Sequence, residues 1–485
     1  MTRVAELERG RLSGFAGWVA VLLFLACGCV GFERQALALP SFARQTGMSC
    51  EACHTVFPEL THFGRMFKAN GYTLSSVPQV KGGVTPEHDE SLSLNRLPPL
   101  SVMLQVSDTT LEKAVPQADD HLARDQNNTI GFPQQLSLFY AGRIAPHIGV
   151  FSQLTYDNQG ATIAIDNTDL RFADLAVLPG DRSLIYGLSV NNNPTVQDLW
   201  NTTPAWGVPY AATNAGVTPL AVTAIDQNFA QDVAGATVYL MWNESLYLEA
   251  GAYRSAKQGY TNQLTGAAGP LDGTATNVID GVAPYWRAAY EQQWQRHSLE
   301  VGVYGATFKL FPGGDTPAAP VALQGPTNRF ADVAEDLQYQ YLGDQNIVSV
   351  AGTRIHETQT LNASFANGTS ANPSDELTTS RLAATYYYRR KWGGTVMYFM
   401  TTGTTDNLLY PYPATGSPGV VGSATGSPNT SGVLTELNYV PWLNVKLSAQ
   451  YTVYTKFNGA GSDYDGNGRN AHDNNTWYFL MWFAY

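Results

Sequence analysis

From Pro98 to the C-terminus, the chain consists of segments of about ten residues in which apolar and polar side chains alternate. The clearest segment runs from Leu443 to Thr455, where every second residue is apolar and the residues between them are polar. Stretches rich in Gly, Pro and Asn separate the segments. A period of two residues predicts β-strands with one apolar and one polar face.

We count sixteen such segments, and an even number is typical of bacterial outer-membrane barrels. They begin near Leu100, Gln134, Ile148, Thr168, Ser183, Gln231, Ser245, Tyr285, Ser298, Phe330, Asn346, Leu377, Gly394, Ser431, Leu443 and Thr476. The connections alternate in length: tight turns such as Pro179–Asp181 follow even-numbered segments, and long loops such as Asn191–Phe229 follow odd-numbered ones. This alternation indicates a barrel with tight turns at one end and long loops at the other.

The composition favours strands whose apolar face does not point to water. Charged residues make up 14% of the chain, against about 25% in typical soluble domains, and there are 26 Tyr and 10 Trp. Several of these aromatic residues fall towards strand ends, as in the interfacial girdles of membrane barrels, and the chain ends on an aromatic residue, Tyr485. We therefore predict a mainly β protein, an outer-membrane antiparallel β-barrel of about 16 strands that contacts lipid. A net charge of −12 argues against a nucleic-acid partner.

The first residues have the features of an export signal. An apolar run from Phe15 to Val30 follows three arginines and precedes the small-x-small site Ala36-Leu37-Ala38. We predict a cleaved signal peptide over residues 1–38, with an uncleaved inner-membrane anchor as the alternative. Residues 39–74 have helical periodicity, residues 75–97 form a predicted linker, and residues 98–485 form the predicted barrel, with the helical segment plugging or capping it.

The motif C-x-x-C-H occurs at Cys50, Cys53 and His54. Two thiols at this spacing reach the two vinyl groups of a haem, and the adjacent imidazole becomes an axial iron ligand. A local disulfide, a zinc half-site or a thioredoxin-like pair are the alternatives, but zinc needs more ligands and the redox pair needs a βαβ setting. We predict one covalently attached haem c.

The sixth iron ligand has three nearby candidates. Met48 lies only two residues before Cys50 and is poorly placed to reach the opposite haem face, whereas His62 and Met66 lie beyond Pro58. A thioether raises the reduction potential relative to a second imidazole, so we favour Met66, with His62 as the alternative. A barrel residue remains a further source of this ligand, and no other catalytic motif identifies a reacting side chain.

The stretch LPSFARQTGMSCEACHTVFPELTHFGRMFKANGY, residues 39–72, resembles the N-terminal domain of the fused monohaem cytochrome c–porins of iron-oxidising bacteria. The resemblance implies an outer-membrane iron oxidase that takes electrons from extracellular Fe(II). It also implies electron transfer through the haem to a periplasmic cytochrome c or copper protein. Cys50, Cys53 and His54 carry over as the haem-binding residues.

About thirty residues are too few to enclose a haem, whereas a barrel of this size has a lumen. We therefore expect barrel side chains to complete the haem pocket. Two other functions fit the same pattern: a porin-like channel with a regulatory haem, and a conduit for a different extracellular electron donor. Acidic residues assigned to long loops are candidates for attracting Fe(II), although loop acids are usually solvated: Asp119, Asp120, Asp166 and Asp272.

Overall fold

The computed structural model describes residues 40–55, 57–80, 94–115, 129–157, 162–213, 217–226, 229, 233–255, 278–312, 325–413 and 422–485. The predicted signal peptide, residues 1–38, lies outside the described residues. No helix in the described ranges is long and apolar enough to cross a membrane.

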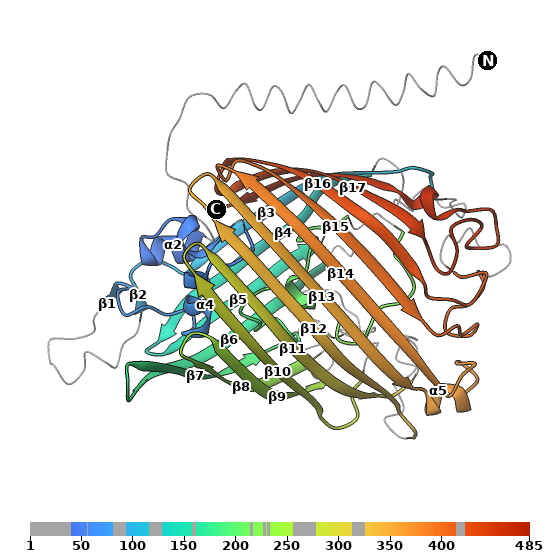
Figure 1. The fold of residues 1–485 in the computed structure, drawn as a ribbon, viewed down its shortest axis with the longest axis horizontal. Coiled ribbons are helices and arrows are strands. Elements are labelled where there is room, and N and C mark those ends of the chain that lie inside the picture. Colours follow the sequence, from blue (N-terminus) through green and yellow to red (C-terminus); the bar gives the residue numbers. More distant parts are fainter. Residues whose placement is uncertain are drawn as a thin grey trace, which may run out of the picture.

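Within the described residues, sixteen strands close into one antiparallel barrel in which each strand pairs with its neighbours in the sequence (Figure 1). The last strand, β18, pairs with the first, β3, and closes the barrel. The strands are β3 (Leu100–Leu111), β4 (Thr129–Ala145), β5 (Ile148–Asp157), β6 (Thr162–Leu178), β7 (Arg182–Asn191), β8 (Val233–Trp242), β9 (Leu246–Ser255), β10 (Ala283–Trp294), β11 (His297–Leu310), β12 (Asn328–Leu342), β13 (Asn346–Thr360), β14 (Ser374–Tyr388), β15 (Trp392–Gly403), β16 (Thr430–Trp442), β17 (Val445–Lys456) and β18 (Thr476–Ala484). Each strand overlaps one predicted segment, so the fold class and the strand number are confirmed.

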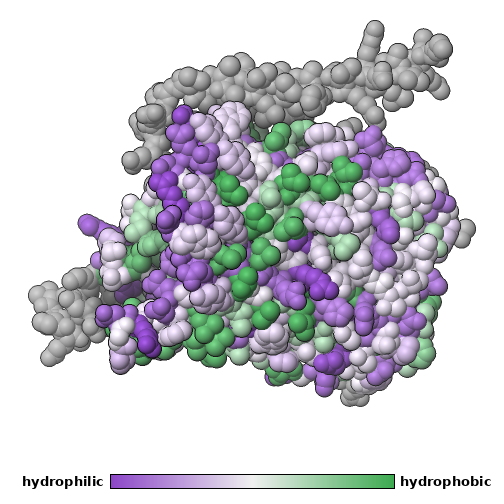
Figure 2. All heavy atoms as spheres, viewed as in Figure 1, coloured by the Kyte–Doolittle hydropathy of each residue, from purple (hydrophilic) through white to green (hydrophobic). Residues whose placement is uncertain are grey.

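The two faces of the wall have the polarity of a membrane barrel. On β10, Trp286 and Tyr290 are 41% and 47% exposed, whereas the residues that follow each of them, Arg287 and Glu291, are each 1% exposed. Figure 2 shows hydrophobic side chains gathered over the middle of the outer wall. An apolar outer band around a polar interior is the architecture of outer-membrane barrels, so the chain is an outer-membrane β-barrel.

The tight turns lie at one end of the barrel, and the N-terminal helices lie at that same end (Figure 1). These helices are α2 (Pro40–Thr46), α3 (Cys50–Cys53) and α4 (His62–Ala69). Arg390, in the turn after β14, donates hydrogen bonds to the carbonyl oxygens of His54 and Thr55 at 3.1 and 2.7 Å. Short turns of such barrels face the periplasm, so the helical segment is on the periplasmic side.

The remaining described elements are short. Strands β1 (Gln79–Val80) and β2 (Leu94–Asn95) pair inside the predicted linker, whose residues 81–93 are not among those described. Helix α5 (Asn362–Ala366) and two 3₁₀ turns (Pro204–Trp206 and Ala471–Asn474) lie in connections between strands.

The long connection after β7 does not stay outside the barrel. Residues 191–204 form an uninterrupted buried run, which includes Trp200 with no exposed surface. Lys68 of α4 donates a hydrogen bond to the Val196 carbonyl at 2.9 Å, so this loop reaches the N-terminal helices through the interior. Helices from one end and a loop from the other therefore meet inside the wall.

Candidate functional site

Helix α4 is positioned by its first turn and by one buried arginine. The Thr61 hydroxyl accepts a hydrogen bond from the Gly64 amide and caps the helix. Arg65, 1% exposed, donates to Glu291 on β10 and to Gln340 on β12 at 2.9 Å. The helical segment is therefore anchored to the barrel wall by charge-assisted hydrogen bonds.

A cavity of about 320 Å³ lies between this segment and the wall. Cys50, Cys53 and His54 all line it. The barrel and the inward loop supply half of the Phe, Tyr and Trp side chains that line it: Phe139, Phe151, Trp206, Tyr210 and Trp482. The helical segment and the barrel therefore line one pocket together.

The donor atoms in this cavity suit the group that the motif predicts. Cys50 and Cys53 are thiols, and burial raises their pKa values to about 12 and about 11. Burial lowers the pKa of His54 to about 4, so its imidazole is neutral at pH 7, as a metal ligand must be. Two thiols, a neutral imidazole and an aromatic pocket fit a haem c.

The ring of His54 is oriented by the backbone. Its Nδ1 lies 3.1 Å from the Glu59 carbonyl oxygen, which accepts a hydrogen bond when Nδ1 carries the proton. Such a hydrogen bond selects the tautomer in which the lone pair is on Nε2, and it raises the basicity of that nitrogen. Glu59 is itself held by Tyr210, whose hydroxyl donates to the carboxylate at 2.8 Å.

The structure places neither predicted sixth ligand on the cavity. Met66 packs in a cluster around Trp200 and Tyr239, and His62 lies 3.1 Å from Glu244 and 3.3 Å from Glu291. The methionines that line the cavity are Met48 and Met103. Met66 is partly buried and points away from the cavity, because contacts with the wall set the orientation of α4.

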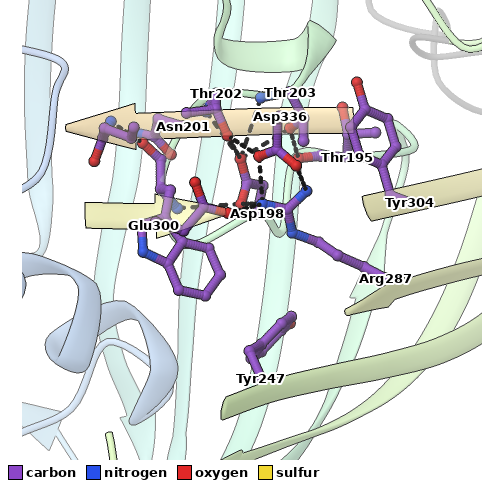
Figure 3. Close-up of polar contacts among 12 residues, drawn as sticks. Thr195, Asp198, Asn201, Thr202, Thr203, Tyr247, Arg287, Glu300, Tyr304 and Asp336 are labelled. Atoms are coloured by element: carbon purple, nitrogen blue, oxygen red, sulfur yellow. Dashed lines mark hydrogen bonds and ion pairs between the residues drawn. The ribbon is translucent and has the colours of Figure 1, made fainter. Parts of the chain in front are cut away.

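A second feature that the sequence did not predict holds the inward loop in place (Figure 3). Arg287 on β10 lies 3.2 Å from Asp198 of the loop, 3.2 Å from Glu300 on β11 and 2.7 Å from Asp336 on β12. All four side chains are buried. Thr202 also donates to Asp336, so the loop is bound directly to β10 and β12. The few charged residues and the two tryptophans of this loop were the sequence features that could have indicated its burial.

Of the four acidic residues predicted to lie in long loops, the structure describes one. Asp119, Asp120 and Asp272 are not among the described residues. Asp166 lies on β6 and lines the same cavity as the cysteines, which corrects its assignment to a loop. Within the described ranges, no group of three or more His, Cys, Asp or Glu side chains is arranged to hold a metal ion.

No protein-family model and no curated protein sequence matches the chain. Among solved structures, it is similar to an anion-selective porin from Comamonas acidovorans at 10% identity, with a TM-score of 0.44 over 80% of this chain and 98% of that one. It is also similar to OmpF of Salmonella typhi at 11% identity, with a TM-score of 0.43 over 80% and 97% of the two chains. OmpT of Vibrio cholerae gives 11% identity and a TM-score of 0.41 over 80% and 96%.

Proposed function

We propose that this protein is an outer-membrane oxidoreductase that takes electrons from extracellular Fe(II) and passes them through one covalently bound haem c. A periplasmic cytochrome c or copper protein is the proposed acceptor. The observation that carries the proposal is the cavity in which Cys50, Cys53 and His54 meet the barrel wall. Each turnover converts one Fe(II) to Fe(III) and adds one electron to the acceptor.

The bound haem would supply reversible one-electron chemistry. Cys50 and Cys53 would hold it through thioether bonds, and His54 would bind its iron through Nε2. The Glu59 carbonyl keeps the imidazole oriented, and aromatic side chains line the pocket. The position of the helical segment among the tight turns favours delivery to a periplasmic partner.

The test is anaerobic addition of Fe(II) at acid pH to the haem-loaded protein purified in detergent, with the haem absorbance followed by stopped flow. Fe(II)-dependent reduction within milliseconds to seconds is the expected result. A haem that dithionite reduces but Fe(II) does not would overturn iron oxidation. Reduced sulfur compounds and an electrode should then be tried as donors, because a conduit for another donor uses the same pocket.

A porin-like channel with a regulatory haem is the second candidate, and the sixteen-strand barrel is the observation that favours it. Against it, α4 and the buried residues 191–204 occupy the interior of the barrel. Swelling of liposomes in small sugars separates the two functions. We expect little swelling from the wild-type protein, and swelling comparable to that of a general porin would support the channel.

A further inference from the structure

One part of the cavity wall carries oxygen-bearing side chains. Four adjacent strands each contribute one: Gln105 on β3, Gln135 on β4, Gln153 on β5 and Asp166 on β6. Asp166 is the one acidic side chain among the residues that line the cavity. This wall and the two cysteines line the same cavity.

A β-bulge turns Asp166 towards the interior. In the part of β6 that follows the bulge in the sequence, Leu170 and Phe172 face outwards, so even-numbered residues of β6 would be expected on the membrane side. The register shifts between the pairs Ser152↔Thr168 and Leu154↔Ile165. In the part of β6 before this shift, an odd-numbered residue, Ile163, is exposed. The extra residue reverses the faces of the strand, which is how bulges re-aim side chains beside functional sites.

Hydroxyl groups fix the orientation of these side chains. Thr155 donates to the Asp166 carboxylate at 3.1 Å, and the Gln153 amide donates to Thr155 and to Ser137, both at 3.1 Å. The Gln135 amide also donates to Ser137 at 3.1 Å. Among the described residues, none donates a hydrogen bond to the side-chain carbonyl oxygens of Gln135 or Gln153. Those acceptors are available to a ligand in the cavity.

We infer that this wall binds a divalent transition-metal cation that keeps part of its water shell, with the Asp166 carboxylate as the charged ligand and the Gln135 and Gln153 carbonyl oxygens as neutral ones. Carboxylate, carbonyl and water oxygens suit Mn(II)-like and Fe(II)-like cations. A single carboxylate gives weak binding, which suits a cation that must leave after each turnover. That the natural cation is Fe(II) rests on the proposed function.

The test measures Mn(II) binding to the haem-loaded full chain in detergent by the electron paramagnetic resonance signal of free Mn(II). Asp166→Asn keeps the size of the side chain and removes its charge, and it should weaken Mn(II) binding by about tenfold, or 1.4 kcal/mol. Gln153→Leu should weaken it less. Asp174→Asn is the matched control, because Asp174 lies on the same strand with an exposed carboxylate that contacts Tyr186 outside the cavity.

Unchanged haem absorbance and far-UV circular dichroism would show that each variant is folded and loaded. Equal Mn(II) affinities for the wild type and Asp166→Asn would overturn the site. A loss of affinity in Asp166→Asn, with a higher Fe(II) concentration for half-maximal haem reduction and unchanged reduction by dithionite, would support it. If Mn(II) binding depends on Asp166 but Fe(II) never reduces the haem, the cation site stands and the proposed iron oxidation fails.

Discussion

Arg65 of α4 and Glu291 of β10 form a doubly hydrogen-bonded ion pair inside the barrel, with N···O distances of 3.0 and 2.5 Å. Both side chains are 1% exposed. Glu291 also accepts a hydrogen bond from Trp200 of the inward loop at 2.7 Å. One carboxylate of the wall therefore holds both the helical segment and the loop that form the cavity.

Arg65→Met should destabilise the folded protein by about 3–5 kcal/mol, because it removes the buried arginine that pairs with the Glu291 carboxylate. Urea-induced unfolding in detergent measures this cost. Arg296→Met, which removes an exposed pair with Asp344, is the control and should cost far less, because water screens that pair. Equal costs for the two variants would show that the buried pair does not anchor the segment.

Gly64→Ala should lower the haem content of the purified protein. A Cβ atom at this position would lie 2.2 Å from the Cys53 carbonyl oxygen, so α3 and α4 would have to separate. Haem absorbance per protein measures the effect. Gly461→Ala is the comparison, since its Cβ would meet only the Thr455 carbonyl oxygen at 3.3 Å in a loop. Full loading of Gly64→Ala would contradict the need for this close packing.

If the protein binds haem c as proposed, spectra of the oxidised protein identify the sixth iron ligand. Met66→Leu and His62→Gln should leave the haem spectrum unchanged, because neither side chain lines the cavity. If a thioether is the ligand, Met48→Leu or Met103→Leu should change the spectrum and lower the reduction potential. A spectral change in Met66→Leu alone would mean that α4 turns when the haem binds.

Lys68 should make the stability of the protein depend on pH. Burial lowers the pKa of Lys68 to about 7, against 10.5 for an ordinary lysine. Between these values the unfolded chain binds the extra proton, so stability should rise as the pH rises from about 7 towards 10.5. Urea midpoints at several pH values measure this rise.

Lys68→Met should remove that component of the pH dependence, while a lysine in an exposed pair, Lys113→Met, should leave it intact. Lys68 also donates to the Asn201 side chain at 3.2 Å, so the variant will lose some stability at every pH. The informative quantity is therefore the slope with pH. An unchanged slope in Lys68→Met would show that another group causes it.

Much of this fold follows from the sequence because its signals are local. Alternation along β17 predicted a strand with Lys446, Ser448 and Gln450 on one face, and these side chains are buried in the lumen. Side chains of a strand alternate between its two faces whatever its neighbours are. Each segment therefore shows its own polarity, and counting the segments gives the number of strands. The motif at Cys50, Cys53 and His54 is local in the same way, since one helical turn brings its groups together.

The tertiary structure decided which side chains complete the pocket. The direction of Met66, the inward course of residues 191–204 and the rotation of Asp166 by a bulge all depend on partners far away in the sequence. Arg65 finds Glu291 across more than two hundred residues, and no pattern around either residue encodes that contact. The sequence alone determined a sixteen-strand barrel preceded by a C-x-x-C-H motif. Only packing inside the closed barrel brought the motif, the inward loop and the wall around one cavity. The charged and aromatic side chains there are buried only when the segment, the loop and the strands are all in place.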